Sequence, residues 1–273
     1  MNTLTDFAFN KYSQFGEDGI IKKIFEIIGS KSNLCVELGA WDGFHLSNTA
    51  NLWTQGWKGV LIEGNKRRFK HLQRNVKEFD CICIHAFVER DESNSLESLL
   101  NNYGISQQID LLCIDIDGND YFVYESLKDI RPRVVICEYN PTIPAEIELL
   151  AEYGNYFGCS VTALKNLAEQ KGYVLIAITQ TNCIFVLNEY ETMFLEFETR
   201  LQFIKNDNYI RYLITSYSGD YVLSKGELAY GVSFPYSGKL IGEYSTVKFS
   251  CRVLRPLFTI IILIKKFVLE RFK

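Results

Sequence analysis

Acidic and amide side chains follow two apolar stretches of the sequence and together could bind a metal ion. Asp115 and Asp117 follow one of these stretches, and Glu138 and Asn140 end the next. Residues two apart on an extended segment share a face, so each pair would point to one side if the two stretches are neighbouring strands. Three carboxylates and an amide oxygen suit a hard divalent cation such as Mg²⁺ or Mn²⁺. Without a cation, such carboxylates would repel one another and raise one another's pKa.

The same segment has a second interpretation. The sequence Asp117-Gly118-Asn119-Asp120 is also typical of a turn followed by a helix cap. The sequence leaves the metal site and the simple turn open.

A glycine-containing turn follows the apolar stretch 34–38, and an acidic residue ends the next stretch. Gly39 and Gly43 are spaced G-x-x-x-G, and Glu63 lies 24 residues after Gly39. Such glycines let the backbone approach a ligand at the carboxyl edge of a sheet, and the acidic side chain can accept hydrogen bonds from both ribose hydroxyls. The dinucleotide pattern G-x-G-x-x-G is absent, so a nucleoside without phosphates fits better. In the alternative, the glycines only make a tight turn and Glu63 is a surface carboxylate.

The three histidines of the sequence differ in their candidate roles. His45 follows the glycine turn, where a general base could face a ligand. His85 lies inside an apolar stretch and is expected in the core. His71 lies among basic residues of a helical pattern and is expected in solvent. His45 is therefore the one histidine kept as a candidate catalytic residue.

Seven short apolar stretches predict the strands of one sheet. Most are continuous rather than alternating, as in strands buried on both faces of a parallel sheet. Helical patterns at 65–79, 95–103 and 162–170 separate some of them, and such alternation is typical of βαβ units. The predicted strands are 34–38, 60–63, 81–87, 109–114, 134–138, 173–178 and 183–187.

The last two predicted strands are joined by only 179–182. A parallel crossover needs about a dozen residues or more, so these strands must form an antiparallel hairpin. The predicted fold is α/β: a doubly wound, seven-stranded, mostly parallel Rossmann-like sheet that ends in this hairpin.

Four segments carry a resemblance to a known family. They are YSQFGEDG at 12–19, VELGAWDG at 36–43, SNT at 47–49 and DIDGNDY at 115–121. These motifs resemble those of the class I S-adenosylmethionine-dependent methyltransferases, and more narrowly the FkbM-type sugar and small-molecule O-methyltransferases. The resemblance covers roughly residues 10–188 and leaves 189–273 unmatched.

The resemblance implies S-adenosylmethionine as the cofactor. In it, Glu37 and the two glycines line the methionine part, Glu63 holds the ribose, and Phe87 or Val88 lies near the adenine. Some sugar and catechol O-methyltransferases also place an acidic metal site at the ends of strands four and five, which favours the metal interpretation above. The implied cofactor contacts are Gln14, Glu37, Gly39, Ala40, Gly43, Ser47, Glu63, Asn65, Phe87, Val88 and Asp115.

The predicted reaction is methyl transfer to a sugar hydroxyl, on a nucleotide-activated or glycan-linked sugar of surface polysaccharide biosynthesis. Methyl transfer from a sulfonium is an in-line displacement, for which the protein holds the acceptor oxygen and removes its proton. A divalent metal would lower the pKa of the hydroxyl, and Asp117 or Asp115 would accept the proton.

Two other classes of protein remain open from the sequence. An NAD-dependent oxidoreductase would share the sheet, although the missing third glycine and the terminal hairpin count against it. A catalytically silent, methyltransferase-like binding module would recruit partners through the aromatic region and the basic tail. The chain keeps Glu37, Gly39, Glu63 and Asp115, which argues against the loss of a functional cofactor site in such a silent module.

Charge and cysteine usage limit the partners and the compartment. Lys and Arg number 29 against 33 for Asp and Glu, and a net charge of −4 does not suggest a nucleic-acid partner. None of the eight cysteines has CxxC spacing, which argues against a zinc site, and six lie in apolar stretches as buried thiols do. Because charged residues also interrupt the first 20 positions, we expect a reduced, cytoplasmic protein without a signal peptide.

The chain changes character after residue 188. Residues 1–188 form the predicted methyltransferase domain, and 189–253 form an accessory region rich in Tyr and Phe. This region either covers the sheet edge or the substrate entrance, or its aromatic residues form the core of a small β-rich extension. In 254–273, the apolar stretch 256–264 is shorter than the roughly 20 residues a spanning helix needs. This tail is either an amphipathic helix on a membrane surface or a helix packed on the body or on a second subunit of a homo-oligomer.

Overall fold

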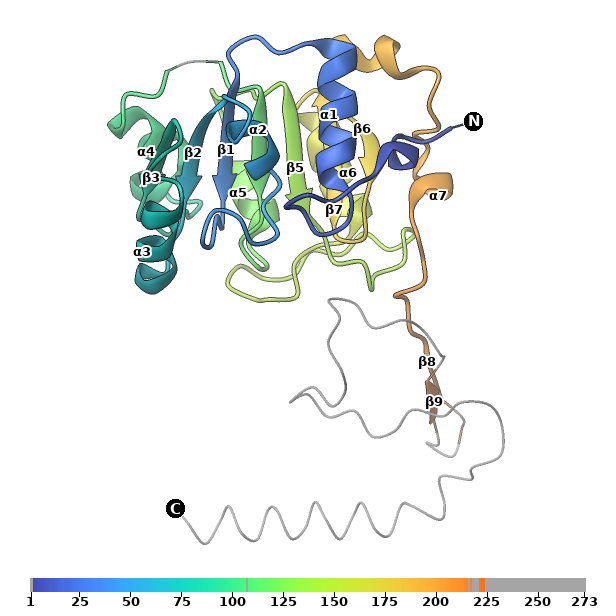
Figure 1. Ribbon diagram of the computed structural model, residues 1–273. Coiled ribbons are helices and arrows are strands. Elements are labelled where there is room, and N and C mark those ends of the chain that lie inside the picture. The colour runs from blue at the N-terminus through green and yellow to red at the C-terminus, as the bar shows by residue number, and fades with distance from the viewer. Residues whose placement is uncertain (1, 107, 216, 218–220, 224–273) are drawn as a thin grey trace, which may run out of the picture. The chain divides into compact units, whose positions relative to one another are not determined.

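The computed structural model describes residues 2–106, 108–215, 217 and 221–223 (Figure 1). The chain divides into two compact units, Met1–Asn206 and Asp207–Lys273. The first unit contains every candidate site residue. In the second unit, β8 (Leu213–Thr215) and β9 (Tyr221–Leu223) form an antiparallel pair.

A seven-stranded sheet in the order β3-β2-β1-β4-β5-β7-β6 forms the centre of the first unit. The strands β1 to β5 are paired in parallel, whereas β7 is antiparallel to both β5 and β6. This confirms the predicted fold class and the terminal hairpin. The strand bounds are β1 Leu34–Leu38, β2 Lys58–Ile62, β3 Cys81–Ile84, β4 Leu111–Ile114, β5 Val134–Glu138, β6 Tyr173–Ile178 and β7 Asn182–Leu187.

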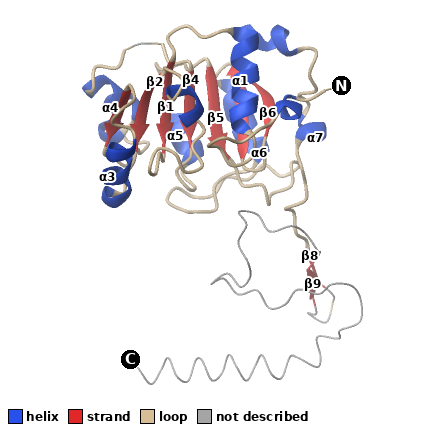
Figure 2. Ribbon diagram, in the orientation of Figure 1, coloured by secondary structure: helices blue, strands red, loops and turns tan. Residues whose placement is uncertain are grey.

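Helices cover both faces of the sheet (Figure 2). One apolar cluster packs α1, α2 and α3 on one face, and a second packs α4, α5 and α6 on the other. Because both faces are covered, the strands are buried almost throughout, which explains their continuous apolar sequences. The helices are η1 Leu4–Phe7, α1 Glu17–Ile28, α2 Ala50–Trp53, α3 Lys66–Asn75, η2 Glu92–Asn94, α4 Leu96–Asn102, α5 Asp120–Ser126, α6 Val161–Gln170, η3 Asn188–Phe194 and α7 Leu201–Ile204.

The order of the strands places a switch point between β1 and β4, because the chain leaves β1 toward β2 and returns at β4. In open α/β sheets, ligands bind outside the carboxyl ends of the strands at such a point. The candidate residues that follow β1, β2, β4 and β5 therefore lie along one edge.

The segment just after residue 188 belongs to the first unit. Tyr190, Phe194 and Phe197 are buried against the face that carries α1. The Tyr190 hydroxyl accepts a hydrogen bond from Arg133 Nε at 2.8 Å. The compact unit therefore extends to Asn206, beyond the change of composition at residue 188. Most of the predicted accessory region, and all of the tail 254–273, lie outside the described residues.

Two further expectations concern the cysteines and the membrane. The seven described cysteines are free, and five of them are buried. Desolvation raises the pKa of the buried Cys35 and Cys113 thiols well above the usual range, as expected for unreactive core thiols. Within the described residues, no helix has the length and apolar character needed to cross a bilayer.

Candidate active site

Glu37, in β1, organises the segment that follows the glycine turn. Its buried carboxylate accepts hydrogen bonds from Ser47 Oγ at 2.6 Å, Thr49 Oγ1 at 2.7 Å and the Asn48 amide at 2.8 Å. Desolvation raises the pKa of the Glu37 carboxyl, and these hydrogen bonds offset part of the increase. The Ser47 hydroxyl also accepts from the Ala50 amide at the start of α2. Both predicted contacts, Glu37 and Ser47, are therefore bonded to other parts of the protein and position the loop.

Gly39 directly follows β1 and lies against the backbone that follows β4. It has a φ of +76°, and a Cβ placed on it would lie 1.8 Å from the Asp115 carbonyl oxygen. The amides of Gly39 and Ala40 both donate to the Ile62 carbonyl, at 3.0 and 3.1 Å. Because those two amides are already bonded, they are not free to hold a pyrophosphate, which counts against the dinucleotide interpretation.

Glu63 follows β2 and joins two loops. Its carboxylate accepts hydrogen bonds from the Trp41 amide at 2.9 Å and from the Asn65 amide at 2.6 Å, and the side chain is only 5% exposed. A carboxylate has about four acceptor positions, so two remain for other donors. Asn65 in turn caps α3, because its side-chain oxygen accepts from the amides of Arg67 and Arg68.

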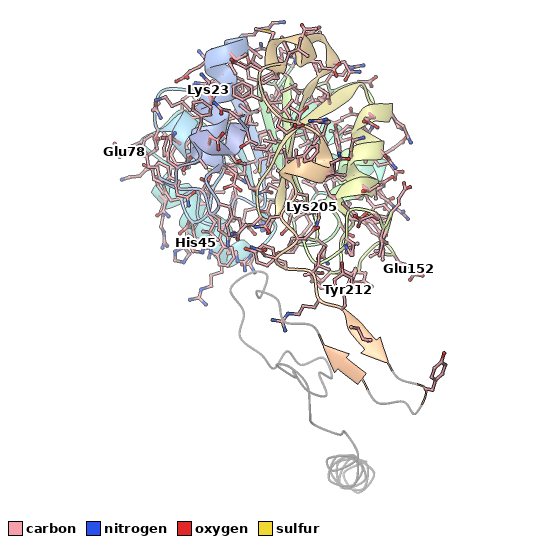
Figure 3. The ribbon with its side chains drawn as sticks, turned by 90° about the vertical axis from the view of Figure 1, so that its right-hand side faces the viewer. Lys23, His45, Glu78, Glu152, Lys205 and Tyr212 are labelled. Atoms are coloured by element: carbon pink, nitrogen blue, oxygen red, sulfur yellow. The ribbon has the colours of Figure 1, made fainter. Side chains whose placement is uncertain are left out.

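His45 lies on the loop after β1, at the lower end of the unit in Figure 3. Its ring packs edge-on against Trp41, with 5.3 Å between centroids, and the Arg68 guanidinium lies 3.5 Å from the centre of the Trp41 ring. Trp41 also has a φ of +48°, which is unusual for a bulky residue and marks a conformation fixed by its surroundings. The His45 amide also donates to Asp42 Oδ1 at 2.8 Å. The described contacts of His45 are therefore within this loop and not with the carboxylates that follow β4 and β5.

The two candidate residues for contact with the adenine, Phe87 and Val88, follow β3 and differ in exposure. Phe87 is 70% exposed, and its ring covers Gly64 so closely that a Cβ there would lie 2.3 Å from a ring carbon. Val88 is buried in the core beneath α4, α5 and α6. Phe87 thus offers an accessible ring beside Glu63, whereas Val88 does not.

The other two predicted cofactor contacts have different surroundings. Gly43 has a φ of +93° and faces Leu72 and Val76, so it is required for packing against α3. Gln14 is exposed in the loop before α1, and its carbonyl accepts a hydrogen bond from Asn10.

Three carboxylates meet at the ends of β4 and β5, as predicted. One oxygen from each of Asp115, Asp117 and Glu138 lies within 4.8 Å of the other two. Desolvation and neighbouring carboxylates raise the pKa of Asp115 to about 8, and the same causes raise the pKa of Glu138 well above its usual range. Ligand oxygens of an octahedral Mg²⁺ site lie about 3 to 4 Å apart, so these three carboxylates are close enough to share a divalent cation after a small movement of their side chains.

The carboxylates meet by a different route from the predicted one. The strand ends at Ile114, and Asp117 has a φ of +59°, so Asp115 and Asp117 are not two apart on an extended segment. Asp120 makes the turn, because its carboxylate accepts from the amides of Ile116 and Gly118, each at 2.8 Å. Desolvation raises the pKa of buried Asp120 to about 6, although these amide hydrogen bonds lower it in part.

Asn140 has a role in the loop that follows β5. Its side-chain oxygen accepts from the amide and the hydroxyl of Thr142, at 2.9 and 2.6 Å, and its amide group donates to the Phe157 carbonyl. The oxygen that the metal prediction requires is therefore already engaged twice. Through Phe157, Asn140 holds the far end of this loop.

Sequence reasoning missed two buried acidic residues at the start of α1. Glu17 accepts from Thr179 and Asn182 of the terminal hairpin, and one oxygen of Asp18 accepts from the amides of 11–13. The other Asp18 oxygen and the Asn182 side-chain oxygen have no partner. The pair belongs to the motif at 12–19, but an acidic first turn is normally solvated. The burial of this pair depends on contacts with the distant terminal hairpin, which become visible only in the structure.

No family model and no curated protein matches this sequence. Solved structures with a similar fold include a TehB-like S-adenosylmethionine-dependent methyltransferase from Corynebacterium glutamicum ATCC 13032 Kitasato, at 10% identity and a TM-score of 0.39 over 63% of this chain and 88% of that one. A putative caffeoyl-CoA O-methyltransferase from Staphylococcus aureus has 14% identity and a TM-score of 0.43, over 62% and 82%. An S-adenosylmethionine-dependent methyltransferase from Aquifex aeolicus has 12% identity and a TM-score of 0.38, over 63% and 88%.

The antiparallel hairpin of β6 and β7 at the end of the sheet is the one predicted from the sequence. The chain has a Rossmann-like α/β fold with a mostly parallel, seven-stranded sheet. Identities this low describe a likeness of fold alone, and no argument about activity rests on them.

Proposed function

We propose that this protein is an S-adenosylmethionine-dependent O-methyltransferase with its cofactor across the carboxyl ends of β1, β2 and β4. The observation that carries the proposal is the Glu63 carboxylate, which two backbone amides fix in place at the end of β2 with two acceptor positions left. That geometry suits the two hydroxyls of a ribose. The accessible Phe87 ring beside it suits an adenine.

The charge of the site supports the same ligand. S-adenosylmethionine supplies a methyl group on a positively charged sulfur. Glu17, Glu37 and Asp115 gather on the side of the sheet covered by α1. Beside the larger effects of desolvation and of its nearer carboxylates, the charges of Glu37 and Glu17 also raise the pKa of Asp115. A partly buried group of carboxylates attracts a cation more strongly than exposed ones would, because the surrounding medium screens less.

The acceptor in this proposal is a sugar hydroxyl, on a nucleotide-activated or glycan-linked sugar of surface polysaccharide biosynthesis in the cytoplasm. As the new bond from oxygen to carbon forms and the sulfur–carbon bond breaks, the hydroxyl proton passes to a carboxylate. Asp117 is the accessible member of the acidic cluster, and Asp115 and Glu138 flank it within 4.8 Å. These three residues would hold the acceptor oxygen and take the proton.

A divalent cation fits the same three carboxylates. When bound, Mg²⁺ or Mn²⁺ would lower the pKa of the sugar hydroxyl. The residues that would hold it are Asp115, Asp117 and Glu138, since the Asn140 oxygen is engaged by Thr142. Their raised pKa values follow from close packing of like charges, which a cation would relieve.

The direct test of the reaction is a screen of nucleotide sugars with S-adenosylmethionine, in which mass spectrometry detects the gain of one methyl group. We expect one sugar class to gain a methyl and S-adenosylhomocysteine to accumulate in equal amount. Removal of metal with EDTA should stop turnover, and added Mg²⁺ or Mn²⁺ should restore it. Full turnover after metal removal would contradict the metal, and binding of NADH in place of S-adenosylhomocysteine would contradict the methyltransferase.

A further inference from the structure

The helix after β2 carries an unusual charge. In α3, Lys66, Arg67, Arg68, Lys70 and Arg74 are basic, and no residue is acidic. The whole chain has a net charge of −4, so this helix is opposite in sign to the rest of the molecule. A local positive surface on an acidic protein requires an explanation of its own.

The basic side chains of α3 are not used for internal ion pairs. Among the described residues, none of the five forms a salt bridge, and all except Arg68 are exposed. Lysines on other helices of the unit behave differently, since Lys22 and Lys165 each face a glutamate one turn away. The charges of α3 are therefore available to a partner.

Exposed apolar side chains surround the same helix. Trp41 is 41% exposed and lies against Arg68, and Leu46 on the same loop is 43% exposed. Phe87 covers Gly64, directly before α3. The end of α3 is joined to this loop, because Asn75 donates to the Asp42 carbonyl at 2.9 Å. Figure 1 shows α3 at the lower end of the unit, on the side of the loop that follows β1.

We propose that α3, with Trp41 and Leu46, is a surface that binds an anionic lipid membrane. Clusters of four to eight Lys and Arg on a helix attract acidic lipid headgroups, and exposed Trp and Leu side chains insert at the interface. A nucleic acid would use the same charges, but it gives no reason for an exposed aliphatic residue such as Leu46. The apolar residues thus favour a lipid surface.

This surface adjoins the carboxyl edge of the sheet, because Trp41 is bonded to Glu63 through its amide. Binding a membrane here would bring the candidate active site to the headgroup region. An acceptor sugar attached to a lipid would then reach the site without leaving the bilayer. The membrane-binding surface itself does not depend on the proposed methyl transfer.

The test is co-sedimentation of the full chain with vesicles of phosphatidylcholine alone and of phosphatidylcholine mixed with phosphatidylserine. We expect binding only to the mixed vesicles, and weaker binding as salt is added. In the variant Lys66→Glu, Arg67→Glu and Lys70→Glu, binding should fall by about 100-fold or more, since each lost basic residue near an acidic surface contributes about fivefold and each new glutamate is repelled. Acidic residues near a helix N-terminus are favourable, so the variant should keep its fold.

The matched control reverses three exposed lysines elsewhere: Lys22→Glu, Lys31→Glu and Lys128→Glu. It has the same net charge as the α3 variant and should bind the mixed vesicles nearly as the parent does. A third variant, Lys265→Glu, Lys266→Glu and Arg271→Glu, tests the basic tail in the same full-length chain.

Several results would overturn the proposal. If the parent chain fails to sediment with the mixed vesicles, it does not bind the lipid and the proposal falls. It also falls if the α3 variant sediments like the parent, or if the lysine control loses as much binding as the α3 variant does. If the α3 variant loses affinity for an RNA oligonucleotide and keeps its vesicle binding, the surface is a nucleic-acid site instead.

Discussion

Three buried acidic residues of this protein hold loops by accepting backbone or hydroxyl hydrogen bonds, without a cationic partner. Glu37 holds 47–49, Glu63 joins the loops after β1 and β2, and Asp120 makes the turn at 116–118. Each is buried and therefore costly to desolvate. Because their hydrogen bonds fix the surrounding backbone, the accessible Asp117 and the free acceptor positions of Glu63 have defined places.

At this scale we predict the effect of removing one carboxylate of the acidic cluster. Glu138→Ala should lower turnover by about 10²-fold or more, the usual effect of losing a positioned proton acceptor. Affinity for S-adenosylhomocysteine should stay unchanged, because Glu138 ends β5, whereas the proposed cofactor lies across the ends of β1, β2 and β4. The control Glu148→Ala removes an exposed carboxylate of the following loop. Normal turnover of Glu138→Ala would place the proton acceptor elsewhere.

The elements of the fold could be predicted largely from the sequence, and the geometry of the site could not. Continuous apolar stretches predicted all seven strands, because burial on both faces leaves a distinctive pattern. The helices α1, of 12 residues, and α5, of 7, are not among the predicted helices; α5 begins at Asp120, within a segment that was also compatible with a turn. The side chain of Asn140 is held by Phe157, 17 residues away, and that of Glu17 by residues of the terminal hairpin, 162 and 165 residues away. Local sequence patterns do not reveal such distant partners.

The contact between the ends of β1 and β4 gives a prediction for an element. Gly39→Ala places a Cβ 1.8 Å from the Asp115 carbonyl oxygen and should push the two strand ends apart. Gly56→Ala is the matched control, because Gly56 also has a positive φ, +94°, but nothing lies within 4 Å of its added Cβ. The control should cost only the strain of a left-handed alanine, about 1–2 kcal/mol.

Urea denaturation of the two variants measures this difference. We expect Gly39→Ala to lose more free energy of unfolding than Gly56→Ala does, and to bind S-adenosylhomocysteine more weakly. If both variants lose the same free energy of unfolding, the added Cβ at Gly39 meets no steric clash. The argument that this position requires glycine would then fail.

Across the whole first unit, a buried ion pair fixes the edge opposite the site. Asp110 and Arg133 are 0% and 2% exposed and lie 2.8 Å apart. Arg133 also donates to the carbonyls of Ile28 and Gly29, so it neutralises the C-terminal end of α1 while joining it to β4 and β5. This network keeps the sheet and α1 in register, and therefore keeps the acidic residues of α1 at the other edge.

The pair predicts how stability depends on pH. Burial alone would raise the pKa of Asp110, but hydrogen bonds from Arg133 and from the amides of 31–33 outweigh it and lower the pKa. A carboxyl with a lowered pKa stabilises the fold above its unfolded pKa of about 4, and the contribution is lost as the pH falls through the folded value. Asp110→Asn should lose about 3–5 kcal/mol at neutral pH and lack that part of the acid slope.

Urea denaturation from neutral pH to below pH 4 would measure this slope. The variant Asp129→Asn, which changes an exposed aspartate, should keep the slope of the parent. An Asp110→Asn variant with the parent's stability and acid slope would contradict the role of the pair.

The central claim is that the carboxyl edge of β1, β2 and β4 binds S-adenosylmethionine. Isothermal titration of the full chain with S-adenosylhomocysteine tests it most directly, because it needs no acceptor. We predict one site per chain, which Glu63→Ala weakens by roughly 1.5–3 kcal/mol through loss of a charged acceptor, while Glu78→Ala, at an exposed residue, leaves it unchanged. No binding by the parent chain, or equal affinity of the parent and Glu63→Ala, would contradict the account.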